Sequence, residues 1–176
     1  MRSAVLSSAG LTAPGRPPWA SGTGVAGAAT LTPAEQLLPG QYGALAPPAE
    51  LTRFGNGRIP PEALAPIGTT GDHLWAPAAA AFEQLSADAA AAGVGIGVND
   101  AYRDYASQER LAAELGLYSQ GGLAAVPGSS THGWGLSVDL ELDPAAQAWM
   151  RQNAAGYGFV EDVAREPWHW TYRPAS

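Results

Sequence analysis

The chain has 176 residues, no cysteine and a formal net charge of −7, and all nine of its basic residues are arginine. This length allows one domain with a hydrophobic core, while the lack of cysteine and lysine excludes disulfides, thiolate ligands and lysine nucleophiles. The negative charge argues against nucleic acid and anionic membrane surfaces as main partners, and no apolar run approaches a membrane-spanning length.

Residues 1–50 are rich in Ala, Gly, Pro, Ser and Thr and show little hydrophobic periodicity. The prolines break any long helix, so we predict an N-terminal arm or linker over 1–50 and a folded domain over 51–176. A short helix is expected over 32–38, where Thr32-Pro33 provides an N-cap and a first-turn proline. Disorder of the arm and docking on a partner or on the domain are both open. The first nine residues begin like a secretion signal, but their apolar core is too short and diluted for us to expect one.

Hydrophobic periodicity and capping signals predict alternating helices and strands in the rest of the chain. Asp104 and Asp143 are N-cap residues, the second followed by proline, and Gly116 provides a helix stop. In chain order the expected elements are a helix over 77–92, a strand over 94–98, a helix over 105–115, a strand over 136–142, a helix over 144–154, and strands over 159–160 and 168–172. This order indicates an α+β or α/β fold.

Two histidines and two carboxylates stand in two short segments near the C-terminus. His132 and Asp139 are seven residues apart, and Glu166 precedes His169 by three. Two histidines and one aspartate can hold a tetrahedral Zn²⁺ with one corner left for water, which is the composition of a catalytic zinc site. The remaining carboxylate can then provide the base that water activation needs.

The odd separations within both pairs require irregular backbone. On a regular strand His132 and Asp139 would point to opposite faces, so we expect the glycines between them to provide a bend. We therefore place His132 on a loop and Asp139 on the following strand. Pro167 disfavours a helical conformation at Glu166, which indicates a turn leading into the last strand.

In their order along the chain, these motifs resemble the zinc D-alanyl-D-alanine carboxypeptidases, the VanY-like branch of peptidase family M15. The motifs that carry the resemblance are Asn-Gly-Arg-Ile-Pro at 56–60, Tyr-Arg-Asp-Tyr at 102–105, Pro-Gly-Ser-Ser at 127–130, Ser-x-His-x-x-Gly-x-x-x-Asp at 130–139 and Glu-x-Trp-His at 166–169. The likeness spans about residues 51–174. Ser137 departs from it, because the family usually has alanine there, but the side chain is small enough to pack. The resemblance implies an α+β fold of the Hedgehog/DD-peptidase type, in which a small antiparallel sheet flanked by helices carries the zinc.

The resemblance also implies the role of each site residue. One Zn²⁺ per chain would be held by His132, Asp139 and His169. Glu166 would be the base that takes a proton from the zinc-activated water and returns it to the leaving amine. Arg103 would bind substrate or stabilise the developing oxyanion, because its planar fork suits a carboxylate or carbonyl oxygen. The substrate-binding candidates are Arg103, Ser130, Gln108 and Trp168.

Simpler structural roles compete with several of these assignments. Ser130 can be a loop cap, Gln108 can support the site from behind, and Arg103 can be a surface charge. Glu141 has the wrong strand parity for a ligand and should face solvent. His73 matches no ligand position and is expected to be structural. We expect three tryptophans to pack around the metal, namely Trp134, Trp168 and Trp170.

The predicted function is a zinc metallopeptidase that hydrolyses peptidoglycan stem peptides, either at the terminal D-Ala-D-Ala bond or at an internal bond. The alternative is a non-catalytic structural or wall-binding component, such as a phage tail protein, that keeps the fold. The presence of Glu166 and Arg103 favours catalysis, and no serine-hydrolase elbow or zincin helix offers a competing site. The cell wall is the expected place of action, without membrane insertion. The proline-rich arm and the lack of a convincing secretion signal suit a phage lysin or virion-associated enzyme with a virion partner, and a bacterial wall enzyme exported by another route is the alternative.

Overall fold

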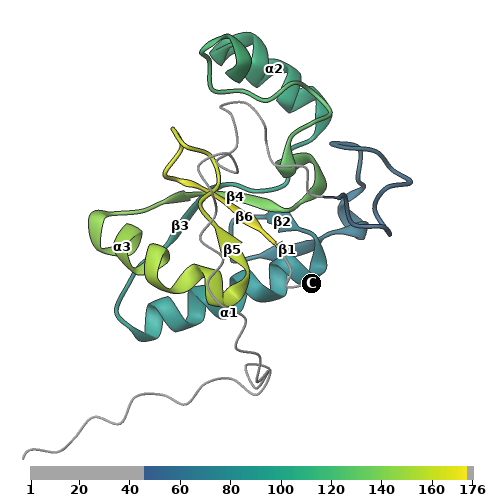
Figure 1. The fold of residues 1–176 in the computed structure, drawn as a ribbon. Helices are drawn as coiled ribbons and strands as arrows, with labels where there is room; N and C mark the ends of the chain where they lie inside the picture. The colour runs from purple at the N-terminus through teal and green to yellow at the C-terminus, as the bar shows by residue number, and fades with distance from the viewer. Residues whose placement is uncertain (1–45, 174–176) are drawn as a thin grey trace, which may run out of the picture. The chain divides into compact units, whose positions relative to one another are not determined.

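The computed structural model describes residues 46–173, which form three α-helices and two antiparallel sheets (Figure 1). The helices are α1 (Ala76–Ala91), α2 (Tyr105–Leu115) and α3 (Pro144–Asn153). The strands are β1 (Ala65–Ile67), β2 (Asp72–Leu74), β3 (Gly97–Asp100), β4 (Ser137–Glu141), β5 (Phe159–Val160) and β6 (His169–Tyr172). The predicted α+β fold is confirmed, whereas the helix expected over 32–38 lies outside the described residues.

The helix boundaries follow the predicted capping residues closely. The side chain of Asp104 accepts a hydrogen bond from the backbone N–H of Ser107 at 2.7 Å, and Asp143 accepts one from Ala146 at the same distance. Gly116 ends α2 with a φ of 71°, which strongly favours glycine. Local sequence therefore decides where α2 and α3 begin, as expected for helices with aspartate N-caps.

Four strands form the larger sheet, in the order β3-β4-β6-β5. Alternate residues of β4 and β6 point to opposite faces, so Val138 and Trp170 are buried in the core on the side of α1 and α3. Asp139 and His169 point to the other face, and α2 lies on the opposite side of the sheet from α1 (Figure 1). Other large buried side chains of the core include Phe82, Leu85, Leu140, Met150 and Phe159. One face thus provides stability and the other remains for polar chemistry.

The structure departs from the predicted elements at three places. The strand expected over 94–98 begins only at Gly97, and its pairing with β4 is interrupted by a register shift between Val98 and Asp100. The β1–β2 hairpin that precedes α1 was not predicted, because its strands of three residues are too short for a periodic signal. His132 lies on a 3-10 turn, Thr131–Trp134, and not on an irregular loop. Within residues 46–173, no helix is both long enough and apolar enough to cross a membrane.

Candidate active site

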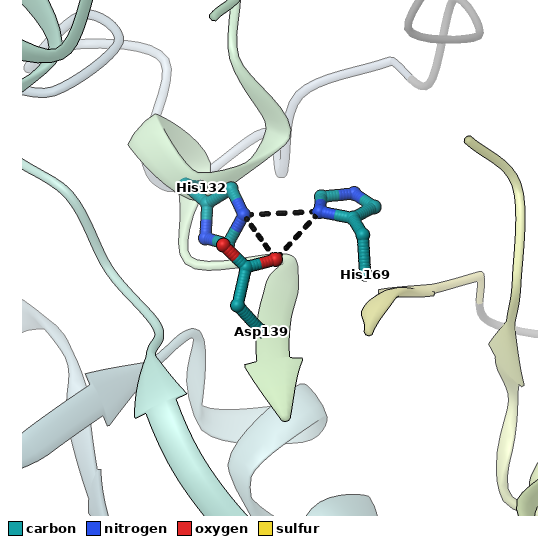
Figure 2. Close-up of side chains that lie close together, drawn as sticks. All are labelled: His132, Asp139 and His169. Atoms are coloured by element: carbon teal, nitrogen blue, oxygen red, sulfur yellow. Dashed lines mark hydrogen bonds and ion pairs between the residues drawn. The ribbon is translucent and has the colours of Figure 1, made fainter. Parts of the chain in front are cut away.

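The pairing of β4 with β6 brings the predicted metal ligands together. Asp139 lies directly opposite His169 in the ladder, and Asp139 Oδ1 is 3.0 Å from His169 Nδ1. His132 enters from the 3-10 turn before β4, with its Nε2 atom 3.1 Å from His169 Nδ1 and 3.3 Å from Asp139 Oδ1. Figure 2 shows the three side chains converging on this small triangle. All three are largely shielded from solvent.

The turn that carries His132 depends on close packing against the Asn56-Gly57 segment. Ser130 caps the turn, its Oγ accepting from the backbone N–H of His132 at 3.3 Å, and Asn56 Nδ2 donates to the Ser130 carbonyl at 2.7 Å. A Cβ atom on Gly133 would come within 2.1 Å of the Asn56 side chain. At the end of the turn, Gly135 adopts a φ of 65°. These glycines provide the bend that the seven-residue spacing requires.

Hydrogen bonds behind the two imidazoles direct their lone pairs into the triangle. His132 Nδ1 lies 2.7 Å from the carbonyl oxygen of Ala101, which can only accept, so the hydrogen is on Nδ1 and the lone pair is on Nε2. His169 Nε2 lies 3.1 Å from Thr171 Oγ1, which leaves Nδ1 as the atom that faces the triangle. Two nitrogen lone pairs and a carboxylate oxygen therefore point at one another.

The size of the triangle fits zinc. Zinc–ligand bonds of about 2.0–2.1 Å place tetrahedral ligand atoms about 3.3 Å apart. The three measured separations are 3.0, 3.1 and 3.3 Å. Such a donor set is mutually repulsive without a cation at its centre, and two imidazoles with one carboxylate are ligands that Zn²⁺ favours. Within residues 46–173, these three residues form the group able to hold a metal ion.

The electrostatics of the triangle also call for positive charge. Burial raises the pKa of Asp139, but the two imidazoles outweigh it and hold the pKa well below its ordinary value. Burial lowers the pKa of His132, and the Asp139 carboxylate more than offsets this and raises it. Burial lowers the pKa of His169. The raised pKa of His132 shows that the triangle favours a positive charge beside Asp139, and a divalent cation would supply that charge in place of a proton.

Glu166 faces the same pocket and is buried, with 6% of its surface exposed. Its Oε1 atom makes no hydrogen bond within the described part of the chain. Burial, followed by repulsion from Asp139, raises the pKa of Glu166 to about 7. A tight turn fixes its place, because its carbonyl accepts the backbone N–H of His169 at 2.9 Å. Glu166 thus has the position and the proton affinity of a general base.

Arg103 also lines the pocket, and its guanidinium is held on three sides. Its Nε atom donates to Asp100 Oδ2 at 2.7 Å, and its Nη2 atom contacts the same oxygen. Nη2 also reaches Asp139 Oδ2 at 3.3 Å, and Nη1 donates to Gln108 Oε1 at 2.9 Å. Arg103 is therefore not a plain surface charge, because it donates a hydrogen bond to the carboxylate of Asp139, a predicted metal ligand.

Gln108 and Asp100 hold Arg103 in place by accepting hydrogen bonds from its guanidinium. Gln108 is buried, its amide donates to the Ala125 carbonyl at 3.0 Å, and it is not among the residues lining the pocket. The structure therefore favours the supporting role for Gln108 over direct substrate binding. Sequence reasoning missed Asp100, which lies beyond the predicted strand over 94–98 and takes its place through the pairing of β3 with β4. Asp100 sits opposite Asp139 in the β3–β4 ladder.

The remaining predicted residues have mixed outcomes. Ser130 is buried, lines the pocket and caps the 3-10 turn, which matches the structural alternative. Trp168 lines the pocket with 37% of its surface exposed. The expectation that Trp134 and Trp170 surround the metal is wrong, because Trp170 belongs to the main core and Trp134 packs on a small cluster of Leu51, Ile59 and Leu64. His73 lies on β2, outside the pocket, and Glu141 is exposed, as predicted. The parity argument for Glu141 is wrong, because it lies two residues from Asp139 on β4 and shares its face of the sheet; Glu141 is outside the pocket because it lies farther along the strand.

Apolar side chains from α2 and the segment after it also line the pocket, namely Leu111, Leu115 and Leu123. Arg165, next to Glu166, links the Glu166 turn to this segment, because its guanidinium donates to the carbonyls of the Gly121-Gly122 turn and lies over the Tyr118 ring. The pocket is therefore lined by both charged and apolar side chains.

Several solved structures are similar to this chain in fold. A variant of the vancomycin-resistance D,D-pentapeptidase VanY from a VanB-type resistance cassette, solved in complex with Zn(II), is 25% identical, with a TM-score of 0.53 and coverage of 65% of this chain and 82% of that one. VanYB in complex with D-alanine-D-alanine is also 25% identical, with a TM-score of 0.51 and coverage of 62% and 76%. The LD-carboxypeptidase LdcB matches at 25% identity, with a TM-score of 0.52 and coverage of 66% and 70%.

The family model for VanY, described as D-alanyl-D-alanine carboxypeptidase, matches residues 72–175. No curated protein matches the chain. The family match contains Arg103, the three residues of the triangle and Glu166, and it spans more than half of the sequence. The chain therefore belongs to the VanY family of D-alanyl-D-alanine carboxypeptidases.

Proposed function

We propose that this chain is a zinc carboxypeptidase that removes the terminal D-alanine from peptidoglycan stem peptides ending in D-Ala-D-Ala. Family membership confirms the prediction of a hydrolytic peptidase. The zinc prediction is confirmed by the VanY neighbour solved with Zn(II) and by the group able to bind a metal here. The observation that carries the proposal is the triangle of donor atoms 3.0–3.3 Å apart, with Glu166 beside it in one pocket.

His132, Asp139 and His169 are the proposed ligands. A bound Zn²⁺ would acidify a water molecule and polarise the scissile carbonyl. Hydrogen bonds to the outer nitrogens hold both imidazoles in place. The Ala101 carbonyl binds His132 Nδ1, and the Thr171 hydroxyl binds His169 Nε2. Fixing the rings in this way maintains the neutral tautomers that present lone pairs to the metal.

Glu166 is the proposed base. A carboxylate without a hydrogen-bond partner on Oε1 can accept a proton from the attacking water, and the same oxygen can then donate it to the leaving amine. The raised pKa of about 7 makes both transfers feasible near neutral pH. Because Glu166 comes from the turn before β6, its distance from the ligands is set by the His169 N–H bond to its carbonyl.

Arg103 is the proposed electrostatic partner of the substrate. Four of the five guanidinium N–H groups are engaged by Asp100, Asp139 and Gln108, which leaves one hydrogen on Nη1 for a substrate oxygen. A donor held this rigidly needs little reorganisation when charge develops on that oxygen. Arg103 would thus serve both the substrate and the metal ligand Asp139.

Removal of the terminal residue is favoured over internal cleavage by the family description and by the D-alanine-D-alanine bound to the VanYB neighbour. The test uses defined pentapeptide and tetrapeptide stems and cross-linked muropeptides, with products identified by mass spectrometry. Loss of one D-alanine from the pentapeptide alone supports carboxypeptidase action. Cleavage of the cross-linked substrate would instead establish an endopeptidase.

The N-terminal arm and the biological setting remain predictions. Residues 1–45 lie outside the described part of the chain, so the boundary at residue 50 and a virion partner rest on composition. The proposed setting is the cell wall, as part of a phage lysin or a virion-associated enzyme. Mass spectrometry of purified virions would test the second form directly.

A further inference from the structure

A cluster of buried hydroxyl groups lies beside the metal triangle on the same face of the sheet. Thr131, Ser137 and Thr171 are all buried, and Ser137 and Thr171 have no exposed surface. Ser137 Oγ donates to Thr131 Oγ1 at 2.6 Å and lies 2.9 Å from Thr171 Oγ1. The β4–β6 register explains the cluster, because Ser137 pairs with Thr171 two residues from the pair of metal ligands. The hydroxyl that distinguishes Ser137 from alanine is therefore hydrogen-bonded.

The carboxylate of Asp162 accepts a hydrogen bond from one member of the hydroxyl cluster, Thr171. Asp162 lies before β6, with 11% of its side chain exposed, and its Oδ1 accepts from Thr171 Oγ1 at 2.9 Å. Its other oxygen, Oδ2, accepts from Arg173 Nη2 at 2.9 Å. An ionised carboxylate can only accept, so the single hydroxyl hydrogen of Thr171 is directed toward Asp162.

The direction of the Thr171 hydroxyl hydrogen decides which ring nitrogen of His169 carries its hydrogen. Because the Thr171 hydroxyl donates its hydrogen to Asp162, the Thr171 oxygen presents lone pairs to its other neighbours. One of these neighbours is His169 Nε2, at 3.1 Å. The Nε2 atom must then carry the imidazole hydrogen, and Nδ1 keeps its lone pair toward His132 and Asp139. The ring is almost fully buried, so water cannot easily replace a lost partner.

We propose that Thr171, oriented by Asp162, is a positioning residue that holds His169 in the tautomer able to bind Zn²⁺. The inference rests on the proposed function, since it assumes that His169 is a ligand. Thr171 does not line the pocket and would not touch the substrate. Its effect is therefore on metal affinity, and residues of this kind typically contribute 10- to 100-fold.

The test compares Thr171→Val with Thr171→Ser in the full chain. Valine keeps the shape and removes the hydroxyl, whereas serine retains it. Zinc affinity is measured by competition with a chromophoric chelator, and the histidine tautomers by ¹⁵N NMR of the metal-free protein at a pH where the rings are neutral. We expect the valine variant to bind Zn²⁺ at least about tenfold more weakly and to lose the Nε2–H signature of His169. The serine variant should stay within about threefold of wild type.

Two further variants complete the design. Ser137→Ala should leave zinc affinity within about threefold of wild type, because the Ser137 hydroxyl donates to Thr131 and the Thr171 hydroxyl donates to Asp162. Thr52→Val is the control, because Thr52 is an exposed threonine whose hydroxyl bonds only within its own turn. If circular dichroism shows that Thr171→Val does not fold, Thr171→Ala replaces it. If the folded variant lacking the Thr171 hydroxyl keeps the zinc affinity and the histidine tautomers of the wild type, the role of Thr171 is overturned and the proposed function is not. Failure of the wild-type chain to bind Zn²⁺ would overturn the proposed function as well.

Discussion

Asp139 on β4 and His169 on β6 are direct partners in the antiparallel ladder, and this pairing sets the 3.0 Å separation of their ligand atoms. The adjacent pair on the same face is Ser137 with Thr171. One strand register therefore builds both the metal triangle and the hydroxyl cluster behind it. A slip of β6 by one residue would turn His169 and Thr171 toward the apolar core.

The first prediction concerns Glu166. Glu166→Gln preserves the shape of the side chain and leaves the three proposed ligands in place, so zinc content and fold should be unchanged. The proton acceptor is lost, and kcat should fall by at least about 100-fold, the lower end of general-base effects. Metal analysis and single-substrate kinetics measure both quantities. The matched control is Glu141→Gln on the same sheet, where the carboxylate is exposed and activity should stay near wild type.

Loss of zinc together with activity in Glu166→Gln would make Glu166 a ligand, and the proposed set of three would be wrong. Retention of both would assign the base to another carboxylate.

The second prediction concerns pH. A glutamate base works when deprotonated, so kcat/KM should be lost as pH falls through the pKa of Glu166. Burial and the charge of Asp139 raise that pKa to about 7, and a bound cation offsets the Asp139 charge and lowers it. The acidic midpoint should thus lie between about 4.3, the ordinary glutamate value, and about 7. Zinc content is measured at each pH, because protonation of the ligands also releases metal. An acidic limb that survives unchanged in the residual activity of Glu166→Gln would exclude this assignment.

The third prediction separates the geometry of Arg103 from its charge. Arg103→Lys keeps the charge but cannot contact Asp100, Gln108 and Asp139 together. We expect kcat/KM to fall at least about tenfold, which corresponds to about 1.4 kcal/mol of transition-state stabilisation. Steady-state kinetics on a D-Ala-D-Ala peptide measures the change. Arg110→Lys on the exposed face of α2 is the control, and an equal effect of both substitutions would deny Arg103 a specific role.

The fourth prediction concerns the N-terminal arm. Contacts of the folded part begin at buried Pro48 and at Glu50, which accepts a hydrogen bond from Trp75 Nε1 at 2.6 Å. Removing residues 1–45 should therefore leave the thermal unfolding temperature and the hydrolysis of small peptides near wild type. Removing residues 1–64 is the contrasting truncation, because it deletes Leu51, Ile59 and Leu64 and should destabilise the domain. If the shorter truncation also unfolds the protein, the arm is part of the core.

Much of the architecture was predictable because its signals are local. Asp104, Asp143 and Gly116 define helix ends through hydrogen bonds and backbone angles within a few residues. The α+β fold followed from the order of elements and from the family motifs. The three proposed ligands and Glu166 could be named because their residue types and spacing are restrictive, and the structure brings them into one pocket.

What could not be predicted depends on contacts between distant segments. Asp100 supports Arg103 only because β3 pairs with β4 at a register shift, which no local pattern reveals. Asp162 and Thr171 acquire their roles from the fold of the chain between β5 and β6. The position of Trp170 in the core, by contrast, was predictable, because it alternates with His169 on the strand expected over 168–172.

The most direct test of zinc-dependent D-alanine release uses one peptide and mass spectrometry. The full chain is stripped of metal, divided, and assayed on a stem pentapeptide ending in D-Ala-D-Ala, with and without one equivalent of Zn²⁺. We predict no product from the metal-free protein, loss of a single D-alanine after zinc is restored, and almost none with zinc-loaded Glu166→Gln. Full cleavage by the metal-free protein, or no cleavage of any wall peptide by the zinc-loaded wild type, would contradict the account.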